Sequence, residues 1–165
     1  MPSLQLNISS LAKKLVSIGI EKQVTFGTAE SCTGGLISSF VTDVAGASAV
    51  FFGGIVSYDN SIKEKLLGVR TQTLAEKGAV SPETAQEMSL GALRALGVDH
   101  TVAVTGIAGP GGGSAQKPVG LVYISTASQN SVTVTENHFS GNREEVRLQT
   151  VEKALSMLIE AIERS

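Results

Sequence analysis

The turn that contains Ser31 is the first place in the sequence where side chains could do chemistry. Two hydroxyls and a thiol occur together in Ser31, Cys32 and Thr33, and Gly34 and Gly35 follow before a segment with helical character. Backbone amides that are free at the start of a helix can hold an oxyanion or a phosphate group. The turn therefore predicts a nucleophile beside an anion-binding backbone, while a serine that only caps the helix stays open as the alternative.

Tyr58 and Lys63 form the second candidate pair, because they flank a turn that leads from a strand into a helix. A lysine acts as a general base only when its pKa lies several units below about 10.4, which burial or a nearby cation can achieve. Most lysines are solvated, so a purely structural Lys63 is the competing interpretation. Ser-x-x-Lys spacings also occur at 10–13 and 114–117, and this common spacing identifies no site by itself.

A glycine-rich loop, TGIAGPGGGSAQKPVG at 105–120, is the third candidate. It follows a predicted strand, and its glycines allow several backbone amides to face one anion, as in the ligand crevices of open α/β sheets. Two known phosphate-binding patterns do not fit, since Gly112 stands where a P-loop needs lysine and Ser114 stands where the dinucleotide fingerprint needs glycine. An anion is expected to be held here in another way, with simple flexibility as the alternative.

Arg143 and Arg147 lie one helical turn apart in the last predicted helix, where both could reach one phosphate group. Ion pairing with the neighbouring glutamates is an equally good interpretation. A thiol nucleophile at Cys32 with His100 or His138 as its base is less favoured, because single cysteines are usually small core residues.

The elements that must position these residues follow from hydrophobic periodicity and from capping residues. Helices that begin at a capping residue and end at glycine alternate with short apolar strands, and the last two strands form a hairpin joined near positions 129 and 130. This order favours a three-layer α/β/α sandwich around a mixed, mostly parallel sheet of about five strands. The expected helices are 9–22, 36–42, 61–67 (capped by Asn60), 82–96 and 143–162, and the expected strands are 24–28, 50–57 (with a bulge or a close backbone approach at Gly53 and Gly54), 101–105, 119–126 and 132–139.

Length and composition limit the remaining possibilities. We expect one domain over 1–165, with an aliphatic core, since 42% of the residues are hydrophobic and 17% are charged. A net charge of -2 argues against nucleic acid, and the absence of a leader or a membrane-length apolar run predicts a cytoplasmic protein without membrane contact. The single cysteine and scattered acidic residues predict neither a metal nor a cofactor. The long aliphatic C-terminal helix favours a homo-oligomer.

Five blocks of the sequence, taken together and in order, resemble the CinA C-terminal domain family. They are AESCTGG at 29–35, FFGGIVSYDNSIKEKLLGV at 51–69, GAVSPETAQEM at 78–88, TGIAGPGGGSAQKPVGLVYI at 105–124 and FSGNREEVR at 139–147. The resemblance implies hydrolysis of the carboxamide of nicotinamide mononucleotide, a small-molecule nucleotide substrate, to nicotinic acid mononucleotide and ammonia in pyridine nucleotide salvage. Many family members carry a further N-terminal domain, whose activities are not transferred to these 165 residues.

The resemblance also implies a role for each matching residue. Ser31 would be the nucleophile, Lys63 the base that takes its proton, Tyr58 a hydroxyl that assists proton movement and Thr105 a residue that orients the substrate. Amides at the adjoining helix start would hold the oxyanion. The substrate-binding residues implied in the same way are Thr33, Gly34, Gly35, Gly106, Gly109, Gly111, Gly112, Arg143 and Arg147.

Two other classes of protein remain compatible with the residues. A nucleotide-binding regulatory module would use the glycine loop and the arginines without any deprotonated lysine. A phosphate-handling enzyme of another type would need a divalent metal held by carboxylates, for which the sequence shows no compact acidic cluster. Ammonia release and its sensitivity to a chelator separate these classes from an amidohydrolase.

Overall fold

The structure is a computed structural model that describes residues 2–165, and its centre is one five-stranded sheet. The strand order is β2-β1-β3-β4-β5, in which β1 pairs in parallel with β2 and β3, and β4 pairs antiparallel with β3 and β5. The predicted mixed sheet is therefore confirmed. The strands are β1 (Phe26–Glu30), β2 (Phe51–Val56), β3 (His100–Gly106), β4 (Leu121–Ser128) and β5 (Val132–His138).

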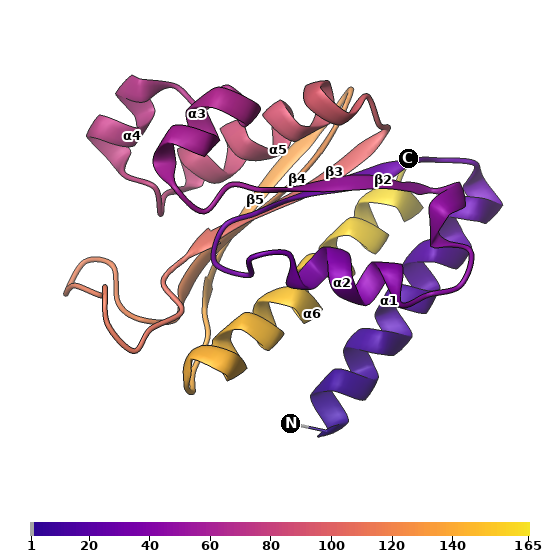
Figure 1. Cartoon of the computed structure of the whole chain (residues 1–165), viewed down its shortest axis with the longest axis horizontal. Helices are drawn as coiled ribbons and strands as arrows, with labels where there is room; N and C mark the ends of the chain where they lie inside the picture. Colours follow the sequence, from indigo (N-terminus) through magenta and orange to yellow (C-terminus); the bar gives the residue numbers. More distant parts are fainter. Residues whose placement is uncertain (1) are drawn as a thin grey trace.

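Helices cover both faces of this sheet, which confirms the predicted three-layer sandwich (Figure 1). One face carries α1 (Pro2–Lys22), α2 (Leu36–Thr42) and α6 (Arg143–Glu163). The other face carries α3 (Asn60–Leu67), α4 (Thr71–Lys77) and α5 (Pro82–Leu96), and a short 3-10 turn, η1 (Ala47–Ala49), precedes β2. Among residues 2–165, no helix combines the length and the apolar character that crossing a membrane requires.

Capping residues explain where most helices begin and end. Ser81 Oγ accepts a hydrogen bond from the amide of Thr84, which starts α5 as predicted, and Gly97 ends that helix with a φ of 62°. The cap of α3 differs from the prediction: Asp59, not Asn60, accepts from the amide of Ser61, at 2.9 Å. The predicted start of α3 is therefore one residue late.

The core is aliphatic and lies on both faces of the sheet, with β1 at its centre. All five residues of β1 are buried, including Glu30, because helices cover the strand on both faces and β2 and β3 cover its edges. The register of β2 shifts between Phe51 and Gly53, one residue before the predicted bulge. Gly54 shows the predicted alternative, a close approach to the side chains of Thr28 and Ser38. The carboxyl ends of β1, β2 and β3 meet at one edge of the sheet, where open α/β folds bind their ligands.

Candidate active site

Ser31 directly follows β1, between strand β3 on one side and the chain segment after β2 on the other. Its amide donates to the carbonyl of Val104 in β3, at 3.1 Å. On the other side, the amide of Ser57, just after β2, donates to the carbonyl of Glu30, at 2.9 Å. The backbone of the Ser31 turn is thus held from both neighbouring strands.

Lys63 reaches this turn from the first turns of α3. Its side chain is 1% exposed, and its Nζ lies 3.0 Å from Ser31 Oγ. The same Nζ contacts two backbone carbonyl oxygens, Ser57 O at 2.7 Å and Tyr58 O at 3.1 Å. Two residues that are 32 positions apart in the chain therefore form a buried serine–lysine pair.

Burial lowers the pKa of the Lys63 amine, and the negative charge of Asp59 opposes this shift only in part. A neutral amine has two N–H groups and one lone pair. Around Lys63, two carbonyl oxygens accept hydrogen bonds and one hydroxyl, that of Ser31, can donate one. These three oxygens can accept from an ammonium, and they also fit a neutral amine that donates to the two carbonyls and accepts from the Ser31 hydroxyl.

Glu30 is a site residue that the sequence analysis missed. Its carboxylate is completely buried and organises the turn between β1 and α2. The oxygens of Glu30 accept from Thr33 Oγ1 (2.7 Å), Ser38 Oγ (2.8 Å), and the amides of Ser38 (2.9 Å), Gly35 (3.0 Å) and Ile37 (3.0 Å). A carboxylate that precedes a helix start is a detectable signal, because it can satisfy the free amides of the first turn.

The role of Glu30 corrects one expectation about the glycines. The amide of Gly35 donates to Glu30, and the amide of Gly34 donates to the carbonyl of Ser31, at 3.1 Å. These amides already have acceptors and are not the free anion-binding groups that the sequence predicted. Within residues 2–165, no backbone carbonyl accepts from the amides of Cys32 and Thr33, which follow Ser31 directly.

Replacing Glu30 by glutamine is expected to lower the free energy of unfolding by about 3 kcal/mol and to reduce activity. Each carboxylate oxygen accepts from at least one backbone amide, so the amide nitrogen of Glu30→Gln must face a backbone N–H in either orientation. Chemical denaturation measures the loss. The matched control is Glu21→Gln, at an exposed position of α1, and equal stability of the two variants would contradict this role of Glu30.

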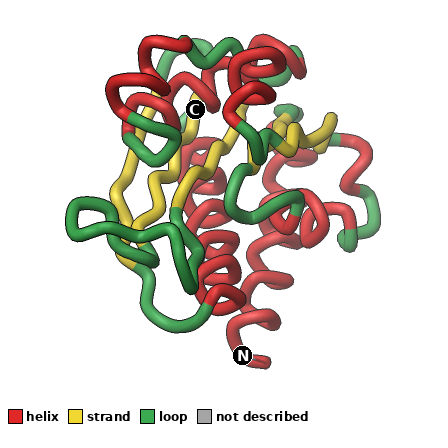
Figure 2. The backbone as a smooth tube through the Cα atoms, turned by 60° about the vertical axis from the view of Figure 1, so that its left-hand side comes forward, coloured by secondary structure: helices red, strands yellow, loops and turns green. Residues whose placement is uncertain are grey.

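Two arginines of α6 connect the turn, the tyrosine and the glycine-rich loop. Arg147 Nη2 donates to the carbonyl of Thr33, at 2.7 Å, while Arg147 Nε is buried without a partner among residues 2–165. Arg143 donates to the carbonyl of Gly109, at 2.9 Å, and to the hydroxyl of Tyr58, at 3.1 Å. The start of α6 therefore lies beside the serine–lysine pair, at the end of the sheet where loops gather (Figure 2).

The remaining predicted residues make their contacts with other parts of the structure. Thr105 follows Val104 in β3, but its hydroxyl donates to the carbonyl of Ala79, at 2.7 Å, and so secures the segment before α5. Gly106 is the last residue of β3 and pairs with β4. Gly111 and Gly112 are exposed in the loop, and no contact joins them to Ser31.

The alternative thiol nucleophile is not supported by the geometry. Burial raises the pKa of the Cys32 thiol to about 12, which keeps it protonated. His100 opens β3 and so lies at the end of the sheet opposite Ser31. His138 pairs instead with Glu136 on β5, at 2.7 Å.

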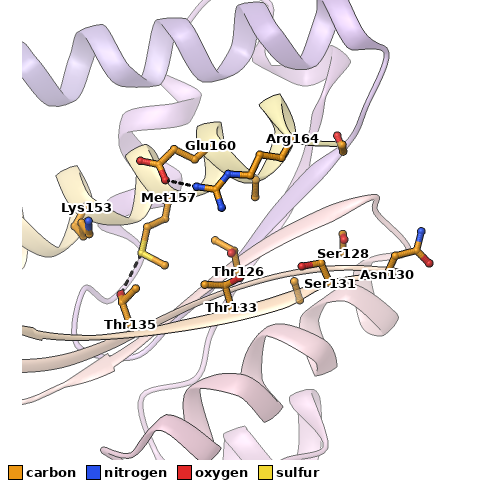
Figure 3. Close-up of a pocket in the computed structure, with 13 residues that line it drawn as sticks. Thr126, Ser128, Asn130, Ser131, Thr133, Thr135, Lys153, Met157, Glu160 and Arg164 are labelled. Carbon is orange, nitrogen blue, oxygen red and sulfur yellow. Dashed lines mark hydrogen bonds and ion pairs between the residues drawn. The ribbon is translucent and has the colours of Figure 1, made fainter.

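A cavity of about 520 Å³ lies away from this pair, between α6 and the strands β4 and β5 (Figure 3). Thr126 and Ser128 line it from the sheet, and Lys153, Glu160 and Arg164 line it from the helix. Neither Ser31 nor Lys63 takes part in its lining. Residues 2–165 contain no group of three histidine, cysteine, aspartate or glutamate side chains placed to hold a metal ion.

The fold and the site define an α/β/α domain with a buried serine–lysine pair at the carboxyl edge of its sheet. Comparison with known families then identifies the domain: the chain belongs to the CinA C-terminal domain family, whose model matches residues 8–162.

Similar proteins agree with this assignment. The chain is 58% identical over 127 residues to a CinA-like protein of Leptospira interrogans, covering 77% of this chain and 30% of that protein. It is 53% identical over 138 residues to a CinA-like protein of Geobacter sulfurreducens, covering 84% of this chain and 33% of that protein. The chain thus spans about a third of the length of these curated relatives.

Solved structures of similar size match the whole fold. The competence/damage inducible protein CihA of Agrobacterium tumefaciens superposes with a TM-score of 0.92 at 48% identity, covering 95% of this chain and 96% of that chain. A CinA superfamily protein of Klebsiella pneumoniae superposes with a TM-score of 0.92 at 32% identity, covering 96% and 99% of the two chains.

Proposed function

We propose that this chain is an amidohydrolase that converts nicotinamide mononucleotide to nicotinic acid mononucleotide and ammonia, with Ser31 as nucleophile and Lys63 as base. The contact that carries the proposal is the 3.0 Å approach of Lys63 Nζ to Ser31 Oγ. A serine attacks an amide only when a neighbouring base takes its proton, and a buried, neutral lysine can do so. The family resemblance supplies the substrate.

Acylation follows from this geometry. Ser31 Oγ attacks the carboxamide carbon while its proton passes to Lys63 Nζ, and the carbonyl electrons move onto oxygen. Lys63 then returns the proton to the amide nitrogen as the C–N bond breaks, which releases ammonia and leaves an ester on Ser31. Water attacks the ester in the second half while Lys63 takes a proton from that water. Lys63 then returns this proton to Ser31 Oγ as the ester C–O bond breaks, which releases the carboxylic acid and restores Ser31.

The oxyanion would be held by the amides of Cys32 and Thr33 rather than by those of Gly34 and Gly35. They follow the nucleophile directly, and no backbone carbonyl in residues 2–165 accepts from them. One well-placed donor of this kind contributes about 3 kcal/mol to stabilising the transition state. The rigid turn around Glu30 holds these amides in place before the substrate arrives.

The substrate phosphate would bind at the start of α6. Arg147 is the better candidate, because its buried Nε has no partner in residues 2–165 and its Nη2 already lies beside the Ser31 turn. Arg143 instead has partners already, since it donates to the carbonyl of Gly109 and to the hydroxyl of Tyr58. The pyridinium charge of the bound substrate would help keep Lys63 neutral by repulsion. The homo-oligomer and the cytoplasmic location stay predictions.

The pH dependence of kcat/KM is expected to report the state of Lys63. Only the neutral amine can accept a proton, so activity should be low below its pKa and rise tenfold per pH unit towards it. Because burial lowers this pKa from its ordinary value of 10.5, the rise should level off below pH 10.5. Measurements above pH 7, where the substrate phosphate is ionised, isolate this effect. A fall in kcat/KM with rising pH in this range would contradict a lysine base.

The direct test is ammonia release from nicotinamide, its riboside, the mononucleotide and the dinucleotide, in the presence of a chelator. Release from the mononucleotide that requires its phosphate supports the proposal. Tight binding of the mononucleotide without ammonia would favour a regulatory nucleotide-binding module instead. Release that stops on addition of the chelator would point to a metal-dependent reaction.

A further inference from the structure

The hydroxyl of Ser57 has no assigned role and no hydrogen-bond partner. The residue is 0% exposed, and its Oγ is one of three buried side-chain atoms without a partner in residues 2–165. A second is Nε of Arg147, beside the Ser31 turn, and the third is Nδ1 of His100, at the far end of the sheet. Buried polar atoms without a partner are rare, because the hydrogen bonds that they make to water in the unfolded chain are not replaced in the fold. Each such atom therefore needs a structural or functional explanation.

The backbone of Ser57 connects the nucleophile's strand to the base. Its amide donates to the carbonyl of Glu30, the residue before Ser31, and its carbonyl accepts from Lys63 Nζ at 2.7 Å. A serine Oγ is only a few bonds from its own carbonyl oxygen. Ser57 is thus in direct contact with the Lys63 amine through its carbonyl, and rotation about one side-chain bond changes the direction of its free hydroxyl.

Lys63 must serve two atoms in turn during the proposed acylation. It first takes the proton of Ser31 Oγ, and as an ammonium it then gives a proton to the leaving nitrogen. The ammonium group has to reorient between these two atoms. This reorientation moves one of its N–H groups away from one of the two backbone carbonyls that it contacts. The contact with Tyr58 O, at 3.1 Å, is the longer of the two carbonyl contacts and so the more easily lost.

We propose that Ser57 Oγ accepts this N–H, so that Ser57 is a positioning residue that holds the Lys63 ammonium while it turns towards the leaving nitrogen. The inference rests on the proposed function. It explains why a buried hydroxyl without a partner stands beside the base: its partner appears only while the reaction proceeds. Hydrogen bonds to charged groups are stronger than those between neutral groups, so their loss is measurable.

The test compares Ser57→Ala with Ser57→Thr, using nicotinamide mononucleotide as substrate. Alanine removes the hydroxyl, and no other group loses a hydrogen bond because this hydroxyl has no partner. The free energy of unfolding should therefore stay equal or rise. We expect kcat to fall about tenfold with KM unchanged. Threonine keeps the hydroxyl and should restore most of the lost kcat.

Full kcat in Ser57→Ala would overturn the inference and leave the proposed function intact. An equal fall of kcat in both variants, with unchanged stability, would also overturn it, since the effect would then not depend on the hydroxyl. If threonine lowers the stability of the fold, Ser57→Ala decides alone. If the wild-type protein releases no ammonia from the mononucleotide, the proposed function itself fails and this inference fails with it.

Discussion

Replacing Ser31 by alanine is expected to lower the rate of ammonia release from nicotinamide mononucleotide by a factor of about 10⁴. The change removes the atom that would form the covalent intermediate, while the amides of Cys32 and Thr33 and the two arginines of α6 remain. The turn should keep its shape, because Glu30 and Val104 hold its backbone rather than the Ser31 hydroxyl. Substrate affinity and stability should therefore stay close to those of the wild type.

The matched control for this change is Ser39→Ala, which removes an exposed hydroxyl from the neighbouring helix α2. It should leave turnover unchanged. Titration calorimetry with nicotinamide mononucleotide separates loss of chemistry from loss of binding. A Ser31→Ala protein that still releases ammonia within tenfold of the wild-type rate would remove this serine from the reaction.

Replacing Lys63 by methionine is expected to lower turnover by a factor of about 10³, which is typical of the loss of a general base. Methionine fills a similar volume without a proton acceptor. The free energy of unfolding should change by no more than about 2 kcal/mol, because two effects oppose each other. The variant no longer has the cost of burying an amine, but the carbonyls of Ser57 and Tyr58 each lose a hydrogen bond.

Lys63→Arg distinguishes a base from a fixed positive charge. Arginine keeps the charge but stays protonated at any pH of interest, so this variant should be as inactive as Lys63→Met. Lys65→Met, at an exposed lysine of the same helix, is the control that should keep full activity. Substantial turnover by Lys63→Arg would show that the site needs a cation at this position and not a base.

The sequence predicted the sheet and most of the helices because their signals are local. Ser81 and Gly97 bracket α5 as their residue types indicate. The first strand begins two residues later than predicted, because the amides of Val24 and Thr25 are taken by the carbonyl of Gly19 and the carboxylate of Asp99. These two residues have β-propensity, but the hydrogen bond of Val24 belongs to the turn after α1 and that of Thr25 goes to a side chain distant in sequence, so neither residue extends the strand.

Helix α4 was not predicted because its signals are weak. It has only seven residues, and Arg70, at its start, makes no capping contact through its side chain. Its position is secured instead by Glu87 of α5, which accepts from the amide of Arg70 and from the hydroxyl of Thr73, at 2.8 and 2.7 Å. Such support comes from another element and leaves no local pattern.

The candidate site likewise contains residues that the sequence indicates and residues whose role depends on contacts from distant parts of the chain. Ser31 and Lys63 are suggested by residue type and by family resemblance, but spacing alone could not join them, because the contact depends on the packing of α3 on α5, which in turn packs on β1. Glu30 was overlooked because a charged residue at the end of a strand is usually solvated, whereas here the turn folds over its carboxylate. The hydroxyl of Ser57 has no sequence signal at all.

The central claim is that a covalent ester forms on Ser31, and mass spectrometry of enzyme quenched in acid during turnover tests it directly. With nicotinamide mononucleotide, the peptide that contains Ser31 should gain the mass of the substrate minus ammonia, and this gain should be absent from Ser31→Ala. The same mass found on Cys32 or on any other side chain, in enzyme that releases ammonia, would contradict the account.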